Sequence, residues 1–171
     1  MFRKAVVDFG QIIRTWDGFG VNYVETSQTR DYSTDPQDYG GFSILSEADR
    51  GRIIELTFGD DGLKPGLIKM FQGPFHQDEP GADYAMNDVK IDPDAYDHER
   101  TTRWMRTFAR EGLELTRRRG QDLQIITGLY GPPAWMTRQR IWRGRDMDPE
   151  RKVEVAKYMA SFAKYLRETE G

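Results

Sequence analysis

Carboxylate side chains are the residues of this sequence best suited to acid–base catalysis. Glu25 follows a short apolar segment, while Asp78 and Glu79 lie side by side in a long acidic stretch. A glutamate in a cleft becomes a general acid when burial tunes its pKa, but the residues around these three give no sign of burial. We interpret them as solvated or hydrogen-bonded structural acids, with a catalytic role as the alternative, and we assign no catalytic residue.

The sequence gives no support for metal or thiol chemistry. His76 and His98 are the only histidines, and no ligand spacing connects them. The chain has no cysteine, which excludes a disulfide scaffold and cysteine–zinc sites. The acids of this stretch do not match the pattern of a calcium loop with its central glycine; they are Asp78, Glu79, Asp83, Asp88, Asp92 and Asp94. We expect no metal and no cofactor.

Clustered arginines are the feature of the sequence that best suggests nucleic-acid binding. They cluster between Arg100 and Arg119 and again between Arg138 and Arg145, with Trp104 among them. Basic clusters with interleaved aromatics can bind nucleic acid. However, 25 basic side chains stand against 28 acidic ones, a formal net charge of −3. A solvated helix face explains the arginines better, so we expect no nucleic-acid partner.

The hydropathy pattern predicts a soluble chain. Hydrophobic residues make up 37% of the sequence, enough for one packed core. No stretch approaches the roughly 18 consecutive apolar residues that a membrane span needs, so we expect no membrane partner. The first residues are too poor in apolar content for a secretory signal, and the compartment stays unknown.

The apolar patterning predicts strands and helices that alternate along the chain. Ser46 and Asp148 are expected to cap helices, and Gly59 and Gly120 to end them. This alternation is typical of a parallel sheet with crossover helices. The expected strands lie at 4–8, 11–16, 17–24, 66–71 and 123–130, and the expected helices at 46–58, 92–119 and 148–166.

The position of the glycines near the N-terminus decides between two architectures. A doubly wound sheet would place a glycine-rich loop between strand and helix, whereas the glycines at 17–20 fall within an expected strand. A (β/α)8 barrel typically needs about 250 residues, so the 171 residues would form roughly its first half. We predict an α/β fold, a partial (β/α)8 TIM barrel of about three βα units. Residues 1–16 would be a short N-terminal strand pair, to be assigned to an accessory β-domain, and residues 17–171 the partial barrel.

Three motifs, taken in order, resemble a known family. The first is Asp17-Gly18-Phe19-Gly20, the second is Phe58-Gly59-Asp60-Asp61-Gly62-Leu63, and the third is Gly131-Pro132-Pro133-Ala134-Trp135-Met136. Together they are similar to the N-terminal part of the barrel in glycoside hydrolase family 30, over about residues 11–171. The third motif is fairly specific, and the first alone is weak.

The resemblance implies a retaining mechanism whose two catalytic glutamates follow strands four and seven of the barrel. This chain stops before a fourth strand, so we expect it to lack both glutamates and to be inactive alone. Our first hypothesis is the N-terminal half of a retaining β-glycoside hydrolase that acts on a polysaccharide or oligosaccharide. The alternative is a non-catalytic carbohydrate-binding or assembly half, completed by a remaining barrel half from the same parent chain or a separate one.

Four residues are our candidates for contacting the carbohydrate substrate. Tyr130 and Trp135 flank a proline-stiffened turn, and aromatic planes stack on the C–H faces of sugar rings at small entropic cost. Asn22 and Lys69 could hydrogen-bond sugar hydroxyls. Two alternatives stay open: Trp135 could plug the barrel mouth, and Lys69 could pair with a buried acid.

Overall fold

The computed structural model describes residues 4–14, 18–23, 41–73, 96, 98–141 and 144–171. Its centre is a sheet of three parallel strands in the order β1 (Gly20–Asn22), β2 (Leu67–Gln72), β3 (Gln124–Leu129). Val21 is in register with Ile68, and Ile68 with Ile125. The predicted alternation of strands and helices in an α/β fold with a parallel sheet is confirmed.

Close backbone approach explains the glycine in β1. A Cβ atom on Gly20 would lie 2.9 Å from Leu67 Cδ2 and 3.1 Å from the Leu67 carbonyl oxygen. Only glycine therefore lets β1 reach hydrogen-bonding distance of β2 at this point. The pairing continues past the strand, because the Tyr23 amide donates to the Lys69 carbonyl over 3.0 Å.

Helix α1 (Glu47–Phe58) begins where the sequence predicts. Its N-cap Ser46 accepts a hydrogen bond from the Asp49 amide at 3.1 Å, which satisfies one of the free amides of the first turn. Ile54 and Phe58 face the core, and the helix ends at Gly59. This helix connects β1 to β2.

Helix α2 (His98–Arg118) lies against α1 at a glycine. A Cβ atom on Gly112 would come within 2.7 Å of the Phe58 ring, so the missing side chain makes room for that ring. Helix α3 (Lys152–Glu170) follows a single 3-10 turn, Pro149–Arg151, whose N-cap is Asp148. The main core joins all three helices and the sheet; it contains Ile54, Phe58, Ile68, Met70, Met105, Phe108, Ala109, Leu123 and Phe162.

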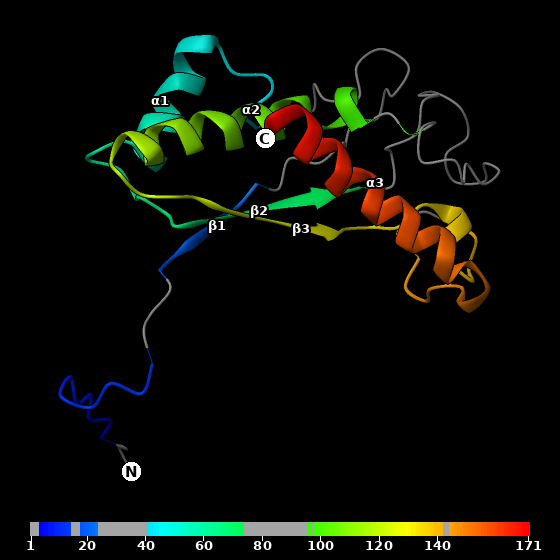
Figure 1. The fold of residues 1–171 in the computed structure, drawn as a ribbon, viewed down its shortest axis with the longest axis horizontal. Helices are drawn as coiled ribbons and strands as arrows, with labels where there is room; N and C mark the ends of the chain where they lie inside the picture. Colours follow the sequence, from blue (N-terminus) through cyan, green and yellow to red (C-terminus); the bar gives the residue numbers. More distant parts are fainter. Residues whose placement is uncertain (1–3, 15–17, 24–40, 74–95, 97, 142–143) are drawn as a thin grey trace.

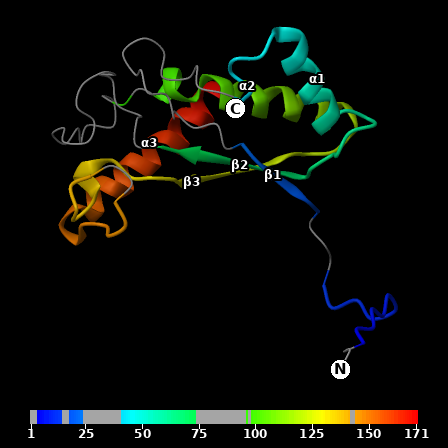
Figure 2. The same cartoon turned by 180° about the vertical axis from the view of Figure 1, so that it is seen from behind.

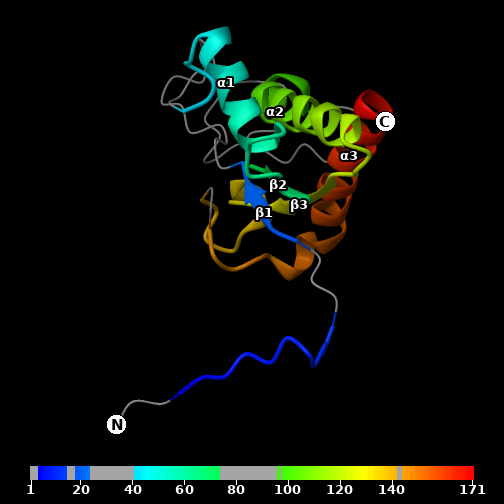
Figure 3. The same ribbon diagram turned by 90° about the vertical axis from the view of Figure 1, so that its left-hand side faces the viewer.

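The three helices lie on one side of the sheet. Figure 1 shows α1, α2 and α3 above and in front of the strands, and Figure 2 shows the same arrangement from behind. In Figure 3, which looks along the strands, the helices again occupy one side of the sheet. On the other side, no described helix covers the strands. The sheet therefore has a helix-covered face and an open face.

Two expectations about elements need correction. Residues 4–14 form a turn but no strand, and their side chains are exposed, because no described segment pairs with them. The strand expected at 17–24 is limited to Gly20–Asn22, with Phe19 exposed. Helix α3 buries only part of its apolar residues: Tyr158 and Phe162 are covered, while Met159 and Ala163 are exposed. The first residues expected in α2, 92–95, lie outside the described ones.

Candidate functional site

The open face of the sheet brings three predicted site residues to one side. Asn22 is in register with Lys69, and Lys69 with Ile126, so Asn22, Lys69 and Ile126 lie next to one another across the three strands. Tyr130 follows β3 with the same parity as Ile126, and its amide donates to the Gln72 carbonyl over 2.8 Å. Because side chains alternate between faces, Asn22, Lys69 and Tyr130 share the open face.

Lys69 and Tyr130 are joined by a residue that the sequence analysis did not select. The Phe71 ring lies with its centroid 4.9 Å from that of Tyr130, at an interplanar angle of 53°. The Lys69 ammonium nitrogen is 4.9 Å from the centroid of the same ring. Gly128 leaves space for the lysine stem, since a Cβ atom there would lie 3.8 Å from Lys69 Cε. Phe71 is two residues after Lys69 and therefore on the same face of the strand, and this spacing could have identified it from the sequence.

The electrostatics of this cluster come from the lysine. Strands β1, β2 and β3 contain no acidic residue. Among the described residues, Lys69 forms no ion pair, so the predicted alternative of a buried acidic partner is not observed there. Its charge rests against the negative face of the Phe71 ring, a cation–π contact. The lysine, in the middle of β2, is thus available as a hydrogen-bond donor on the open face.

Trp135, the fourth predicted residue, is placed elsewhere. It belongs to the short 3-10 turn Ala134–Met136, is only 3% exposed, and meets Tyr158 edge to face at 6.1 Å between centroids. Its buried Nε1 has no hydrogen-bond partner among the described residues. It packs with Tyr96, Met136 and Tyr158, a cluster that includes a residue of α3. The structure therefore separates Trp135 from the other three, and its contact with a sugar stays a prediction.

The turn after β3 is held by a network of hydrogen bonds. Gly131 takes a positive φ of 71°, which reverses the chain at the start of the motif. Arg140 then donates to the Trp135 carbonyl over 2.8 Å and pairs with Asp148 at 2.8 Å. The Asp148 amide in turn donates to the Met136 carbonyl over 2.7 Å. These contacts link the end of β3 to the beginning of α3.

His98 has a structural setting that the sequence analysis did not foresee. Its Nε2 lies 2.9 Å from the Ser161 hydroxyl, which donates to the Tyr158 carbonyl at 2.7 Å. That hydroxyl has one proton, so Nε2 must donate to it. Burial lowers the pKa of His98 from 6.5 to about 4. This histidine therefore connects the start of α2 to α3 as a neutral ring.

The remaining candidates for catalysis or metal binding can be checked only in part. Glu25, Asp78, Glu79 and His76 lie outside the described residues, as do the other acids of their loop. Within the described ranges, no group of three or more His, Asp or Glu side chains could hold a metal ion. Within the same ranges, no helix is long and apolar enough to cross a bilayer.

Comparisons with known proteins place the fold rather than the activity. The sequence matches no protein-family model and no curated protein. Among solved structures, SrfJ from Salmonella typhimurium superposes with a TM-score of 0.59 and 17% identity over 92% of this chain and 32% of that one. The endo-β1,6-glucanase BT3312 gives a TM-score of 0.58 and 18% identity over 91% of this chain and 32% of that one.

These comparisons complete the description of the fold. The chain spans about a third of the length of each of the two structures. At this level of identity, the likeness concerns the fold and leaves individual residues open. The chain therefore has a glycoside hydrolase-like fold, in which three parallel strands carry their helices on one face.

Proposed function

We propose that this chain is the N-terminal part of a retaining β-glycoside hydrolase of the family 30 type. In this proposal, the open face of the sheet forms part of the saccharide cleft. The observation that supports it best is that Asn22, Lys69 and Tyr130 lie on the face that no described helix covers. In a (β/α)8 barrel, that face lines the interior, and the chemistry takes place at the carboxyl ends of the strands.

The cluster has the chemical features of a sugar-binding surface. The Tyr130 ring is exposed and lies against the buried Phe71 ring, a contact that restricts its orientation before a ligand binds. A braced aromatic ring loses little entropy when a sugar stacks on it. Lys69 and Asn22 add donors, and Asn22 also an acceptor, for the hydroxyls around the ring. The chemistry of this surface suits a neutral oligosaccharide.

The catalytic pair must come from other parts of the barrel in this proposal. Retention requires two carboxyl groups about 5–5.5 Å apart, one as nucleophile and one as acid and then base. No carboxylate lies on β1, β2 or β3. The described strands would therefore bind and orient the sugar, while carboxylates on further strands form and hydrolyse the glycosyl-enzyme. This chain alone would bind without turnover.

A second function, a non-catalytic binding half that requires a partner chain, is favoured by the edge of the sheet. β3 pairs only with β2 among the described strands, and Ile125 and Ile126 on its two faces are 41% and 45% exposed. Parallel strands with apolar residues on both faces are normally buried. A further barrel half would pair with the edge of this strand and cover Ile126 on the open face, whether it belongs to the same parent chain or a separate one.

Calorimetric titration with gluco-oligosaccharides tests the first proposal. A β1,6-linked trimer is the first ligand to use because one structural neighbour is an endo-β1,6-glucanase; a β1,4-linked trimer is the comparison. We expect saturable binding to the purified chain, weakened about tenfold by Tyr130→Ala or by Lys69→Met. Release of reducing ends, assayed in parallel, should stay at the level of the buffer.

Matched variants control for general damage. Phe9→Ala removes an aromatic ring from the exposed segment 4–14, and Lys157→Met removes an exposed lysine from α3. Both should bind like the parent chain. Absence of binding to either trimer, or equal losses in the site and control variants, would contradict the proposal. A partner-dependent half would instead bind only after a chain that supplies the missing strands is added.

A further inference from the structure

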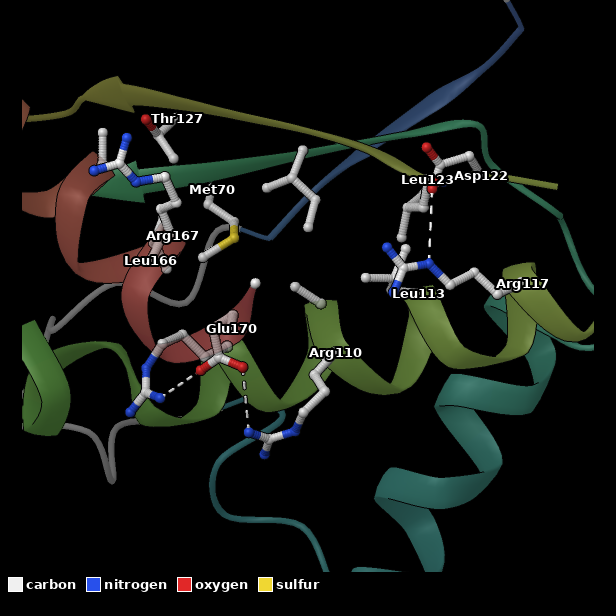
Figure 4. A pocket seen from close by; sticks show the side chains of 15 residues that line it. Met70, Arg110, Leu113, Arg117, Asp122, Leu123, Thr127, Leu166, Arg167 and Glu170 are labelled. Carbon is white, nitrogen blue, oxygen red and sulfur yellow. Dashed lines mark hydrogen bonds and ion pairs between the residues drawn. The ribbon is translucent and has the colours of Figure 1, made fainter.

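A groove lies on the helix-covered side of the sheet, apart from the proposed sugar surface. Figure 4 shows it between β3, the second half of α2 and the end of α3. Its volume is about 420 Å³, which is within the range of roughly 300–1,000 Å³ typical of small-molecule sites. None of Asn22, Lys69, Tyr130 and Trp135 lines it. Along β3 its lining ends at Thr127, whereas Tyr130 follows the end of that strand.

The inner wall of the groove is apolar. Met70 and Leu123 form its deep part, and Leu113 and Leu166 flank it from the two helices. Ile125 points into the same space and is 41% exposed, although the neighbouring Ile68 on this face is fully buried. Contact between water and such an apolar surface is unfavourable, so an apolar ligand that covers Ile125 would be favoured.

The rim of the groove is positively charged. Four arginines and two acids line it: Arg106, Arg110, Arg117 and Arg167 against Asp122 and Glu170. The Glu170 carboxylate forms ion pairs with Arg106 at 2.6 Å and with Arg110 at 3.4 Å. It therefore already lies between two guanidinium groups. The Arg117–Asp122 pair is longer, 3.9 Å, and both side chains are exposed. Among the described residues, Arg167 has no ion pair, so neither of the two rim acids neutralises its charge.

We propose that this groove binds an amphipathic organic anion, such as a medium-chain carboxylate. The apolar body would cover Ile125 and Leu166, and the carboxylate would pair with Arg167. Charge complementarity selects an anion, because the two rim acids leave this arginine unpaired. The apolar wall selects a ligand with a hydrophobic body over inorganic phosphate or a free sugar. This inference does not depend on the proposed glycosidase function.

Methyl NMR of the full chain, with the isoleucine δ1 methyls labelled, provides the test. Decanoate, kept below its micelle concentration, is the probe, and decanol is its uncharged counterpart. Ile125 and Ile126 are neighbours of similar exposure on opposite faces, so Ile126 is an internal control. We expect decanoate to shift the Ile125 signal saturably and to leave Ile126 unchanged. Decanol should bind at least about tenfold more weakly.

Two arginine variants test whether binding depends on the ion pair between the ligand carboxylate and Arg167 or on hydrophobic contact alone. Arg167→Gln removes the unpaired rim charge and should weaken decanoate binding about tenfold. Arg145→Gln changes an exposed arginine outside the groove and should leave it unchanged. The inference would be overturned by a failure to saturate, by equal shifts at both isoleucines, by equal affinity for decanol, or by equal effects of the two variants. A melting curve of each variant verifies that it is folded.

Discussion

The two faces of β2 differ in what they contact, although they belong to one strand of six residues. Ile68 and Met70 point toward the helices and are buried in the main core. Lys69 points to the open face, against the ring of Phe71 and across from Asn22. Because successive side chains of β2 point to opposite faces, residues that stabilise the core alternate with residues that face a ligand in the proposed function. Substitutions on the helix-covered face should unfold the chain, and those on the open face should change ligand affinity.

The side chains of β3 also alternate between the two faces, but they are less buried than those of β2 that face the helices. Ile125 and Ile126 are on opposite faces, yet both remain about two-fifths exposed, at 41% and 45%. Ile125 is exposed to the groove between α2 and α3, and over Ile126 no helix of the described ranges lies on the open face. The strand at the edge of the sheet is therefore less covered than β2 in both directions.

The largest effect is expected where the helix-covered face is most densely packed. Phe58→Ala removes a ring that is fully buried against Phe108 and the backbone of Gly112. We expect the free energy of unfolding to fall by about 3–5 kcal/mol, measured by urea denaturation. Phe9→Ala, which removes a 91% exposed ring, should change it by less than about 0.5 kcal/mol. Similar losses for the two variants would contradict the assigned core.

Acid should weaken the junction of α2 and α3 through His98. Its pKa is about 4 in the folded chain and 6.5 when unfolded, so below 6.5 the unfolded state binds the proton first. The free energy of unfolding should therefore drop by about 3 kcal/mol between pH 6.5 and 4. His98→Gln keeps a donor for Ser161 without this titration. The difference between parent and variant, which removes the contribution of carboxylates, should shrink as pH falls; a constant difference would refute the prediction.

A smaller effect is expected at the beginning of α1, outside the core. Ser46→Ala removes the acceptor for the Asp49 amide. We expect a loss of about 1 kcal/mol in the free energy of unfolding, with oligosaccharide affinity unchanged because α1 does not contribute to the open face. Ser46→Asp restores an acceptor and should recover most of the loss. A change in affinity with the alanine variant would show that the two faces are coupled.

Sequence reasoning predicted the elements that depend on local signals. The cap at Ser46, the end of α1 at Gly59 and the two longer strands are all encoded by neighbouring residues. The strand pair expected at residues 4–16 is not formed by the described residues 4–14, because β-propensity without a pairing partner does not make a strand.

The candidate site was predictable where alternation within a strand decides the face. Asn22, Lys69 and Tyr130 lie on one face because of the register of the strands and the alternation of their side chains. Phe71 was missed because an apolar residue in a buried strand looks like core. The placement of Trp135 depends on tertiary contacts with Tyr158, which lies far along the chain and has no local signature.

The most direct test of the account is an oligosaccharide titration of the chain with labelled isoleucine δ1 methyls. If the open face binds sugar, the Ile126 signal shifts saturably with the β1,6-linked trimer, and Ile125, one residue away on the other face, stays in place. Tyr130→Ala should reduce the affinity about tenfold without altering the spectrum of the free protein elsewhere. A titration that leaves Ile126 unmoved, or that moves Ile125 equally, would contradict the assignment of the open face as a saccharide surface.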